Sequence, residues 1–566
     1  MTRLAVALVL CAACGDNAAF APEPHCDDWR QWGGNAAHTG ASCAAGQPLA
    51  RALADVVLDP LAADEEKDGQ GDLVIHFQAP LVAGDAVYVE TKGGAYTPCE
   101  QQTIDHMVVP DCFEPDELYR LNTETWSEVR YSWHDGALEA DWSFTSDWTP
   151  EPGMGFEPVF HPVIAGDTIA IPGAAGSVWV VDAATGKLVR HVEPHGFDAD
   201  TYVAGPITER GGTLYYNALA LDHDSPWSAP VRAWLVAVDP DGDVRTASYA
   251  DLVPGAPAAN AGCYTRFDPT KTTVYPPPPN DDGTPALPPL EPCGTQLPGV
   301  NSAPAFALDG TLYVVTHAQY NESYSYLVAI DPSSMTATWA RSLRGLLDDG
   351  CGVTEMCPDY AAPGVDPATN LPPAAAVDRD SSSSPVVMAD GTILYGAFTA
   401  YNAVRGHLLA FSHDGRFRGS YGFGWDTTPA VAGDRVVLKD NHYFDWDANG
   451  GPYYLTALDS SLDMMWQFQN TETKSCTTEP DGSQRCIGDH PDGFEWCVNA
   501  PAIDRDGTIF ANSEDGYLYA ITADGQLRDR FFLDRSLGAA YTPVALDHAG
   551  RIYALNNGHL IVVGAD

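Results

Sequence analysis

The sequence predicts an all-β fold, an eight-bladed β-propeller built from four-stranded antiparallel blades. Three observations carry this prediction. A unit of four short strands recurs along the chain, its closest copies start 42 to 44 residues apart, and the last copy is one strand short. Four strands at this period are the size of one propeller blade. A missing strand is expected where the two ends of a closed ring pair with each other.

The segment from Asn301 to Leu343 shows the unit most clearly. It contains the strands APAFAL, TLYVVT, SYLVAID and ATWARSL, and Asp309-Gly310 forms a tight turn between the first two. Short apolar runs separated by Gly, Asp and Pro are typical of strands joined by hairpin turns. We expect the inner strand of each blade to start near a proline: Pro80, Pro162, Pro206, Pro304, Pro385, Pro429, Pro501 and Pro543.

The last copy, from Tyr541 to Asp566, has three strands. Because a propeller must hide its sheet edges, we expect the N-terminal side of the chain to supply the fourth. The apolar run from Leu73 to Phe77, directly before the first inner strand, is the candidate. We count eight blades, and seven is the alternative if the weak first copy is misread.

The charge of the chain restricts its partners. Its 29 Lys and Arg against 77 Asp and Glu give a net charge of −48. Nucleic acid and a bare anionic membrane surface are therefore excluded as partners. We expect a protein partner or a polar ligand, and a monomeric chain.

The N-terminus has the pattern of an export signal. Arg3 precedes an apolar run from Leu4 to Ala13, which is too short to span a bilayer as a helix. The residues Ala12-Ala13-Cys14 resemble a bacterial lipobox, in which the cysteine becomes the lipidated first residue. This interpretation gives a signal peptide over residues 1–13, a tether and N-terminal motif over 14–60, and a single propeller over 61–566. It predicts an outer-membrane lipoprotein facing the periplasm or the cell surface, attached to the membrane only through its lipid; an ordinary cleaved signal peptide is the alternative.

The cysteines also indicate export. Once Cys11 is removed and Cys14 is acylated, eleven of the 13 cysteines are left. An oxidising compartment favours disulfides, whereas a zinc site needs two tight cysteine pairs, which are absent. The candidates are the local pairs Cys26 and Cys43, Cys99 and Cys112, Cys263 and Cys293, and Cys351 and Cys357, followed by the trio Cys476, Cys486 and Cys497, one of which has no local partner.

Two motifs point to a known family. The segment from Asp28 to Gly40, DWRQWGGNAAHTG, resembles the N-terminal motif of propellers built from pyrroloquinoline-quinone-like (PQQ-like) repeats. Trp339 and Trp466 end fourth strands, which resembles the A-x-D-x-x-T-G-x-x-x-W repeat of quinoprotein propellers. That resemblance implies that the tryptophans pack between neighbouring blades. The second copy has Arg190 at the tryptophan position.

Long insertions fall on one face of the predicted ring. In a propeller, the second-to-third loops and the blade-to-blade loops share one face, which we call the crown; here the turns of the other two kinds are short. Four of the five cysteine groups lie in crown loops, where disulfides would order them. Loops held by a rigid scaffold are where function concentrates, although neutral drift of tolerated insertions is the alternative. The insertions are Lys92 to Asp116, Trp133 to Phe160, Ala218 to Arg232, Pro254 to Val300, Arg344 to Ser381, Lys439 to Pro452 and Thr471 to Trp496.

Two sets of residues are candidate ligand sites. Small polar residues at the crown ends of inner strands could bind a polar ligand at the channel mouth, or they are small because the strands converge there. Asp445, Asp447 and Asn449 match the first half of a calcium loop, although Thr456 stands where a bidentate Glu is wanted and a plain turn explains them too. The channel-mouth residues are Ser302, Ser384, Thr428, Asn499, Tyr541 and Thr542.

Three functions follow. The first is an exported, lipid-anchored scaffold that binds or assembles partners through its crown and has no catalytic residues; it resembles, in repeat type and anchoring, the propeller lipoproteins of the outer-membrane barrel-assembly machinery. The second is a PQQ- and calcium-dependent alcohol dehydrogenase, which the quinoprotein resemblance implies. PQQ is disfavoured because there is no adjacent Cys-Cys pair and no CxxCH site, whereas calcium stays open. The third is a surface protein that binds carbohydrate or another substrate.

Overall fold

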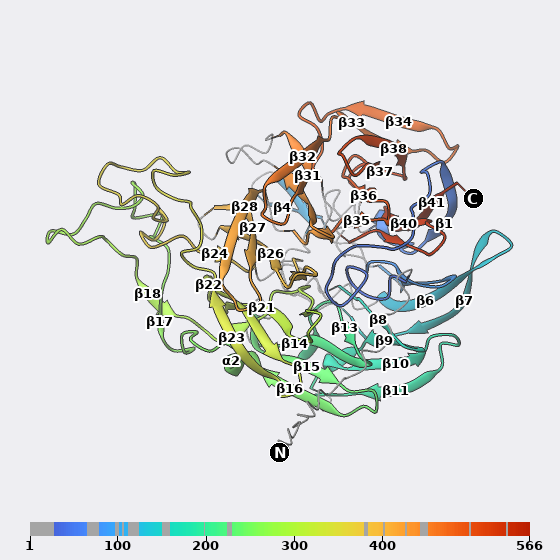
Figure 1. The fold of residues 1–566 in the computed structure, drawn as a ribbon, viewed down its shortest axis with the longest axis horizontal. Helices are drawn as coiled ribbons and strands as arrows, with labels where there is room; N and C mark the ends of the chain where they lie inside the picture. The colour runs from blue at the N-terminus through green and yellow to red at the C-terminus, as the bar shows by residue number, and fades with distance from the viewer. Residues whose placement is uncertain are drawn as a thin grey trace, which may run out of the picture.

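The computed structural model of the chain is a ring of eight antiparallel sheets around a central axis, five with four strands and three with five (Figure 1). The structure describes residues 28–64, 78–96, 101–104, 107–110, 124–149, 159–196, 198–222, 229–378, 383–399, 402–424, 427–441, 451–496, 500–538 and 542–565. The predicted eight-bladed propeller is confirmed, and the seven-bladed alternative is excluded.

Each blade is an antiparallel meander whose first strand lies at the axis. Blade 1 is β2 (Leu81–Ala83), β3 (Ala86–Gly94), β6 (Glu124–His134) and β7 (Ala137–Thr145). Blade 2 is β8 (Val163–Ala165), β9 (Thr168–Pro172), β10 (Val178–Asp182) and β11 (Leu188–Val192). Blade 6 is β29 (Ala430–Ala432), β30 (Arg435–Asn441), β31 (Tyr453–Leu458) and β32 (Met464–Gln469). Blade 7 is β35 (Ala502–Ile503), β36 (Ile509–Asn512), β37 (Tyr517–Ile521) and β38 (Leu527–Phe532).

Blades 3, 4 and 5 have an inner strand in two pieces that both pair with the second strand. Blade 3 is β12 (Thr201–Val203) and β13 (Thr208–Arg210), β14 (Thr213–Asp222), β15 (Ala229–Val238) and β16 (Val244–Ser248). Blade 4 is β19 (Gln296–Leu297) and β20 (Ala305–Phe306), β21 (Leu312–Ala318), β22 (Asn321–Asp331) and β23 (Thr336–Ser342). Blade 5 is β24 (Ala375–Ala376) and β25 (Val386–Val387), β26 (Ile393–Thr399), β27 (Asn402–Phe411) and β28 (Phe417–Phe423).

Among the described residues, three short hairpins and a few helical turns lie outside the blades. The hairpins are β4 (Gln101–Ile104) with β5 (Met107–Pro110), β17 (Gly262–Tyr264) with β18 (Leu290–Pro292), and β33 (Lys474–Thr478) with β34 (Gln484–Gly488). The helical turns include η3 (Ala174–Gly176) and α2 (Tyr249–Leu252). No helix in the described ranges is both long and apolar enough to cross a bilayer.

Blade 8 closes the ring with a strand from the N-terminal side, as predicted, but the strand is a different one. It is β1 (Arg51–Val57), which pairs with β41 (His559–Gly564) outside β40 (Ile552–Asn556) and β39 (Ala545–Leu546). The expected run from Leu73 to Phe77 lies outside the described residues. Most of β1 is exposed or half-buried, because an outermost strand packs little, so its sequence lacks the apolar pattern that would reveal it.

A second correction concerns blade 1. The segment from Trp133 to Phe160, expected to be a crown insertion, contains the fourth strand β7 and its tight turn at Asp135-Gly136. The connection to blade 2 begins only after Thr145. Polar residues alternate along β7, which is again an outer strand.

The hydrophobic core consists of layers between neighbouring blades. Tyr88 of blade 1 and Ile171 of blade 2 belong to one such cluster, and Phe306 and Leu235 join blades 3 and 4 in another. Both faces of second strands such as β21 and β26 are buried, which explains why their sequences are nearly continuous apolar runs.

A recurring contact on the outer edge of the ring joins four of the blades to the next one. The indole nitrogens of Trp339 and Trp466 each donate a 3.1 Å hydrogen bond to a carbonyl in the last turn of the following blade, on His413 and Ala523. The predicted interblade packing of both tryptophans is therefore confirmed. Arg190 makes the equivalent contact between blades 2 and 3, since its guanidinium donates a hydrogen bond to the Pro240 carbonyl at 2.7 Å. Trp142 on β7, which the sequence analysis placed in a loop, donates to the Ala183 carbonyl at 3.1 Å.

The N-terminal motif has a structural role that its spacing did not reveal. Residues 29–47, which we call the strap, run around the axis and contact the inner edge of all eight blades in order. Every contact lies beside a first-to-second turn, so the strap covers the face opposite the crown. The contacts, from blade 1 to blade 8, join Trp29 to Val82, Arg30 to Ile164, Gln31 to Glu209, Ala36 to Phe306, Ala37 to Val387, Thr39 to Val431, Gly40 to Ile503 and Gln47 to Gly550.

Candidate functional site

The predicted channel-mouth residues lie around the axis of the ring, which makes the axis a candidate ligand site. The residues before the eight inner-strand prolines form a ring around it, and all of them are buried. Ser384 and Thr428 are completely buried and hydrogen-bond across blades: the Ala303 amide donates to Ser384 Oγ at 2.9 Å, and the Ser384 amide donates to Thr428 Oγ1 at 2.9 Å. These hydroxyls therefore join blades 4, 5 and 6. The ring is Ala79, His161, Gly205, Ala303, Ser384, Thr428, Ala500 and Thr542.

The other predicted channel-mouth residues are placed only in part. Ser302 is buried, and its carbonyl accepts a 2.8 Å hydrogen bond from the Asn217 side chain. Thr542 is buried, and its hydroxyl makes no hydrogen bond within the described part of the chain. Asn499 and Tyr541 lie outside the described residues. Ligand binding by this set stays a prediction.

Side chains of the strap fill the axis. Trp32 packs against Ala79 and Ala303, which belong to blades 1 and 4. His38 bridges blades 3 and 5, since its Nδ1 lies 2.9 Å from the Pro385 carbonyl of blade 5 and its Nε2 lies 3.5 Å from Thr208 Oγ1 of blade 3. The ring of His161 packs edge-on against Trp32, with centroids 5.6 Å apart.

The electrostatics of this filled axis do not suit a cation. Burial lowers the pKa of His38 and of His161 to about 4, so both imidazoles are neutral at pH 7. None of the eight ring positions carries a carboxylate. Across the described residues, no three His, Cys, Asp or Glu side chains come close enough to hold a metal ion.

A calcium–quinone pair therefore does not fit the described axis. Calcium binds mainly to carboxylate and carbonyl oxygens, whereas the ring positions carry no carboxylate, and the hydroxyls of Ser384 and Thr428 already accept hydrogen bonds between blades. A planar cofactor would also compete with Trp32 and His38 for the same space. The alternative calcium loop of Asp445, Asp447 and Asn449 lies outside the described residues.

The crown carries one substantial projection, which lies beside blades 4 and 5 and extends away from the ring (Figure 1). It is formed by residues 254–300 and 344–374, which we call the lobe. The two segments are joined by hydrogen bonds from the Phe267 amide to the Ala368 carbonyl at 2.8 Å, from Tyr360 to the Pro276 carbonyl at 3.1 Å and from Asn370 to the Ala286 carbonyl at 3.1 Å. Together they make one structural unit from two blade connections.

Two predicted disulfides hold the lobe, Cys263–Cys293 and Cys351–Cys357, and both are confirmed. The lobe is fixed to blade 4 through Asn321, whose side chain donates to the Tyr264 carbonyl at 2.7 Å. Arg344 also packs over the ring of Tyr324, 4.8 Å from its centroid. The lobe is thus held at its base as well as within itself.

Apolar side chains are exposed on and beside the lobe. Met356 is fully exposed, Leu290 is 55% exposed, and Tyr320 at the neighbouring turn of blade 4 is 65% exposed. Single exposed apolar residues are ordinary on protein surfaces, but this part of the chain also exposes Val274, Leu287, Val353 and Tyr360. These side chains come from segments that disulfides and hydrogen bonds hold together.

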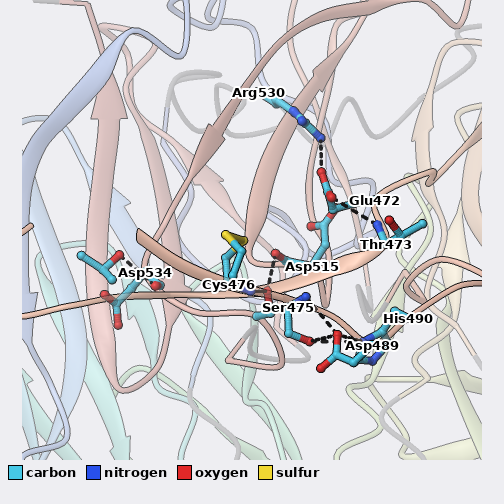
Figure 2. Close-up of a disulfide and its surroundings, with 12 residues drawn as sticks. Glu472, Thr473, Ser475, Cys476, Asp489, His490, Asp515, Arg530 and Asp534 are labelled. Atoms are coloured by element: carbon cyan, nitrogen blue, oxygen red, sulfur yellow. Dashed lines mark hydrogen bonds and ion pairs between the residues drawn. A yellow bond between two sulfur atoms is a disulfide. The ribbon is translucent and has the colours of Figure 1, made fainter. Parts of the chain in front are cut away.

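A second stapled crown element lies beside blade 7. The predicted disulfide Cys476–Cys486 is confirmed and joins directly paired residues of the β33–β34 hairpin (Figure 2). The hairpin is docked because the Cys476 amide donates to Ser536 Oγ at 2.8 Å and the Ser536 amide donates to the Cys476 carbonyl at 2.9 Å. Nearby, Arg530 pairs with Glu472 at 3.4 Å (Figure 2). The hairpin exposes one large apolar side chain, Ile487, whereas the lobe exposes several.

The remaining cysteine predictions are only partly covered by the structure. Cys43 is disulfide-bonded. Cys14, Cys26, Cys99, Cys112 and Cys497 lie outside the described residues. The three disulfides among the described residues indicate an extracytoplasmic protein.

Comparisons with known proteins give the fold and no closer relationship. No family model matches the chain, and no curated protein matches it. A quinohemoprotein alcohol dehydrogenase from Comamonas testosteroni is 12% identical, with a TM-score of 0.51 over 96% of this chain and 82% of that chain. A europium-containing methanol dehydrogenase is 11% identical, with a TM-score of 0.48 over 93% and 89%. BamB from Moraxella catarrhalis is 13% identical, with a TM-score of 0.39 over 77% and 89%. At these identities the likeness shows the eight-bladed PQQ-like propeller fold alone.

Proposed function

We propose that this protein is an exported binding scaffold, anchored by a lipid on Cys14, that docks a partner protein on the lobe. The observation that carries the proposal is the exposure of apolar side chains on a projection held by two disulfides. Burying one such side chain in an interface contributes about 1.5–3 kcal/mol. Because the disulfides already order the loops, less conformational entropy is lost when a partner binds.

The filled axis supports a scaffold over a dehydrogenase. Trp32 and His38 occupy the space around the axis, and the surrounding positions offer neutral or apolar groups. Reconstitution with PQQ and calcium, followed by cofactor absorbance and dye-linked alcohol oxidation, separates the two functions. We expect neither signal; stoichiometric quinone binding would overturn the scaffold proposal.

Paired surface variants test the docking surface itself. Leu290→Asp with Met356→Asp places two charges on the lobe, and we expect at least a tenfold loss of partner capture from solubilised envelope proteins of the source cells. The control is Leu308→Asp, because Leu308 is 61% exposed in a tight turn on the opposite face. Equal capture by the lobe variant and the wild type would exclude the lobe as the binding surface.

The anchor has its own test. Cys14→Ser should move the protein from the membrane fraction to the soluble fraction, while an Ala12→Gly control should leave it membrane-bound. Retention of the Cys14→Ser variant on membranes would refute the lipid anchor without affecting the docking proposal.

A further inference from the structure

Two completely buried glutamates lie side by side in blade 1. Glu90 on β3 and Glu128 on β6 are directly opposite each other across the strand pair. Such positions place the Cβ atoms about 4.5–5.5 Å apart. Two like charges this close, on completely buried side chains, strongly oppose ionisation of both groups.

Gln78 connects the two carboxyl groups. Its amide nitrogen donates to Glu90 Oε2 at 3.3 Å, and its side-chain Nε2 donates to Glu128 Oε1 at 3.4 Å and to the Tyr88 carbonyl at 3.2 Å. Among the described residues, the second oxygen of each carboxyl group and Gln78 Oε1 are buried and have no hydrogen-bond partner. Three acceptor oxygens on completely buried side chains therefore share this place and lack a donor from the described part of the chain.

The nearest buried ion pair does not neutralise the glutamates. Lys92 Nζ lies 2.7 Å from Asp59 Oδ2, and both side chains are inaccessible to solvent, so that pair is already balanced. When both glutamates are ionised, these four groups carry a net charge of −2.

We infer that Glu90, Glu128 and Gln78 bind a divalent cation with a preference for hard oxygen ligands, calcium in the first instance. A divalent ion matches the charge of the two carboxylates, and it would coordinate the three oxygens that have no donor. Gln78 Oε1 supports the site because it is buried and unpaired among the described residues. It belongs to a residue whose backbone amide contacts Glu90 and whose side-chain amide contacts Glu128. The site has only two carboxylates, because its third oxygen belongs to an amide.

Cation binding to the full-length protein tests the inference. Equilibrium dialysis against calcium after EDTA treatment gives the number of ions per chain for the wild type and for E90Q/E128Q. We expect this number to fall by one in the variant. The control is D135N/E139Q, which removes two exposed carboxylates from the same blade and should leave the number unchanged.

A second readout keeps the test valid if the double variant fails to fold. Trp126 lies two residues before Glu128 on β6 and is completely buried, so terbium at this site should be sensitised by tryptophan excitation. We expect E128Q alone to reduce this luminescence at least tenfold relative to D135N/E139Q. Unchanged stoichiometry in a folded E90Q/E128Q variant, or unchanged luminescence in E128Q, would mean that protons alone neutralise the pair and would overturn the inference.

Discussion

Replacing Gly40 by alanine should destabilise the protein more than the same change at Gly166, because Gly40 lies in the strap. The two glycines have nearly the same backbone conformation, with φ of 64° and 59°. A β-carbon at Gly40 would lie 2.8 Å from the Pro501 carbonyl oxygen and 3.0 Å from Ala430 Cβ, whereas one at Gly166 meets nothing within 4 Å. The pair therefore separates the cost of the backbone conformation from the cost of crowding.

The expected magnitudes follow from these distances. Both variants incur about 1–2 kcal/mol for a left-handed conformation with a side chain. Gly40→Ala adds about 1–3 kcal/mol, because its β-carbon must displace the backbone of blades 6 and 7. Urea unfolding followed by tryptophan fluorescence measures the difference.

Hydrogen exchange locates the effect. The Ile503 amide donates to the Gly40 carbonyl at 2.8 Å, and the Val431 amide donates to the Thr39 carbonyl at 2.7 Å. We expect Gly40→Ala to accelerate exchange at these two amides, and Gly166→Ala to leave them protected. Equal unfolding midpoints and equal exchange in the two variants would refute the docking of the strap on the ring.

Three further predictions concern blade locking, the axis and the lobe. Trp466→Ala should lower the free energy of unfolding by about 2 kcal/mol, because the indole covers Gly525 and donates a hydrogen bond to the Ala523 carbonyl of blade 7. The control is Met465→Ala, at an exposed position of the same strand, which should lower it by less than about 0.5 kcal/mol. Burial lowers the pKa of His38 and of His161 to about 4, so these histidines take up protons in the unfolded chain at a higher pH than in the folded protein. The free energy of unfolding should therefore fall as the pH drops from 6.5 towards 4, by up to about 3 kcal/mol per histidine. Urea midpoints at pH 7 and pH 5 measure this loss, and a loss in His161→Gln as large as in the wild type would contradict it. C263S/C293S should speed tryptic cleavage after the exposed Lys271 while the unfolding midpoint of the ring changes little, and unchanged cleavage would show that the disulfide does not order the lobe.

The repeat architecture was predictable from the sequence because blade interiors carry strong local signals. Strands such as β21 and β26 are buried on both faces and read as apolar runs, and prolines mark the inner strands. The outer strands β1 and β7 were misassigned because they are half-exposed and their polar residues hide the two-residue period. Identifying β1 required its partner β41, which lies at the other end of the chain.

The roles of the strap and of the buried glutamates could not be predicted in the same way. The hydrogen bonds of Trp29 to Gln47 reach eight blades, and no local pattern encodes such contacts. Glu90 and Glu128 are ordinary strand residues in sequence, and only the register of β3 and β6 brings them together with Gln78. By contrast, three of the disulfides were predictable because each joins cysteines that are only 6 to 30 residues apart in sequence.

Site-specific photocrosslinking tests the central claim, that a partner docks on the lobe, most directly. A photoreactive amino acid at Met356 samples the lobe, and one at Leu308 samples the opposite face at a side chain that is also exposed. In cells that make the protein, the account predicts one discrete crosslinked protein from position 356 and none from position 308. A discrete crosslink from position 308 with none from position 356 would contradict it.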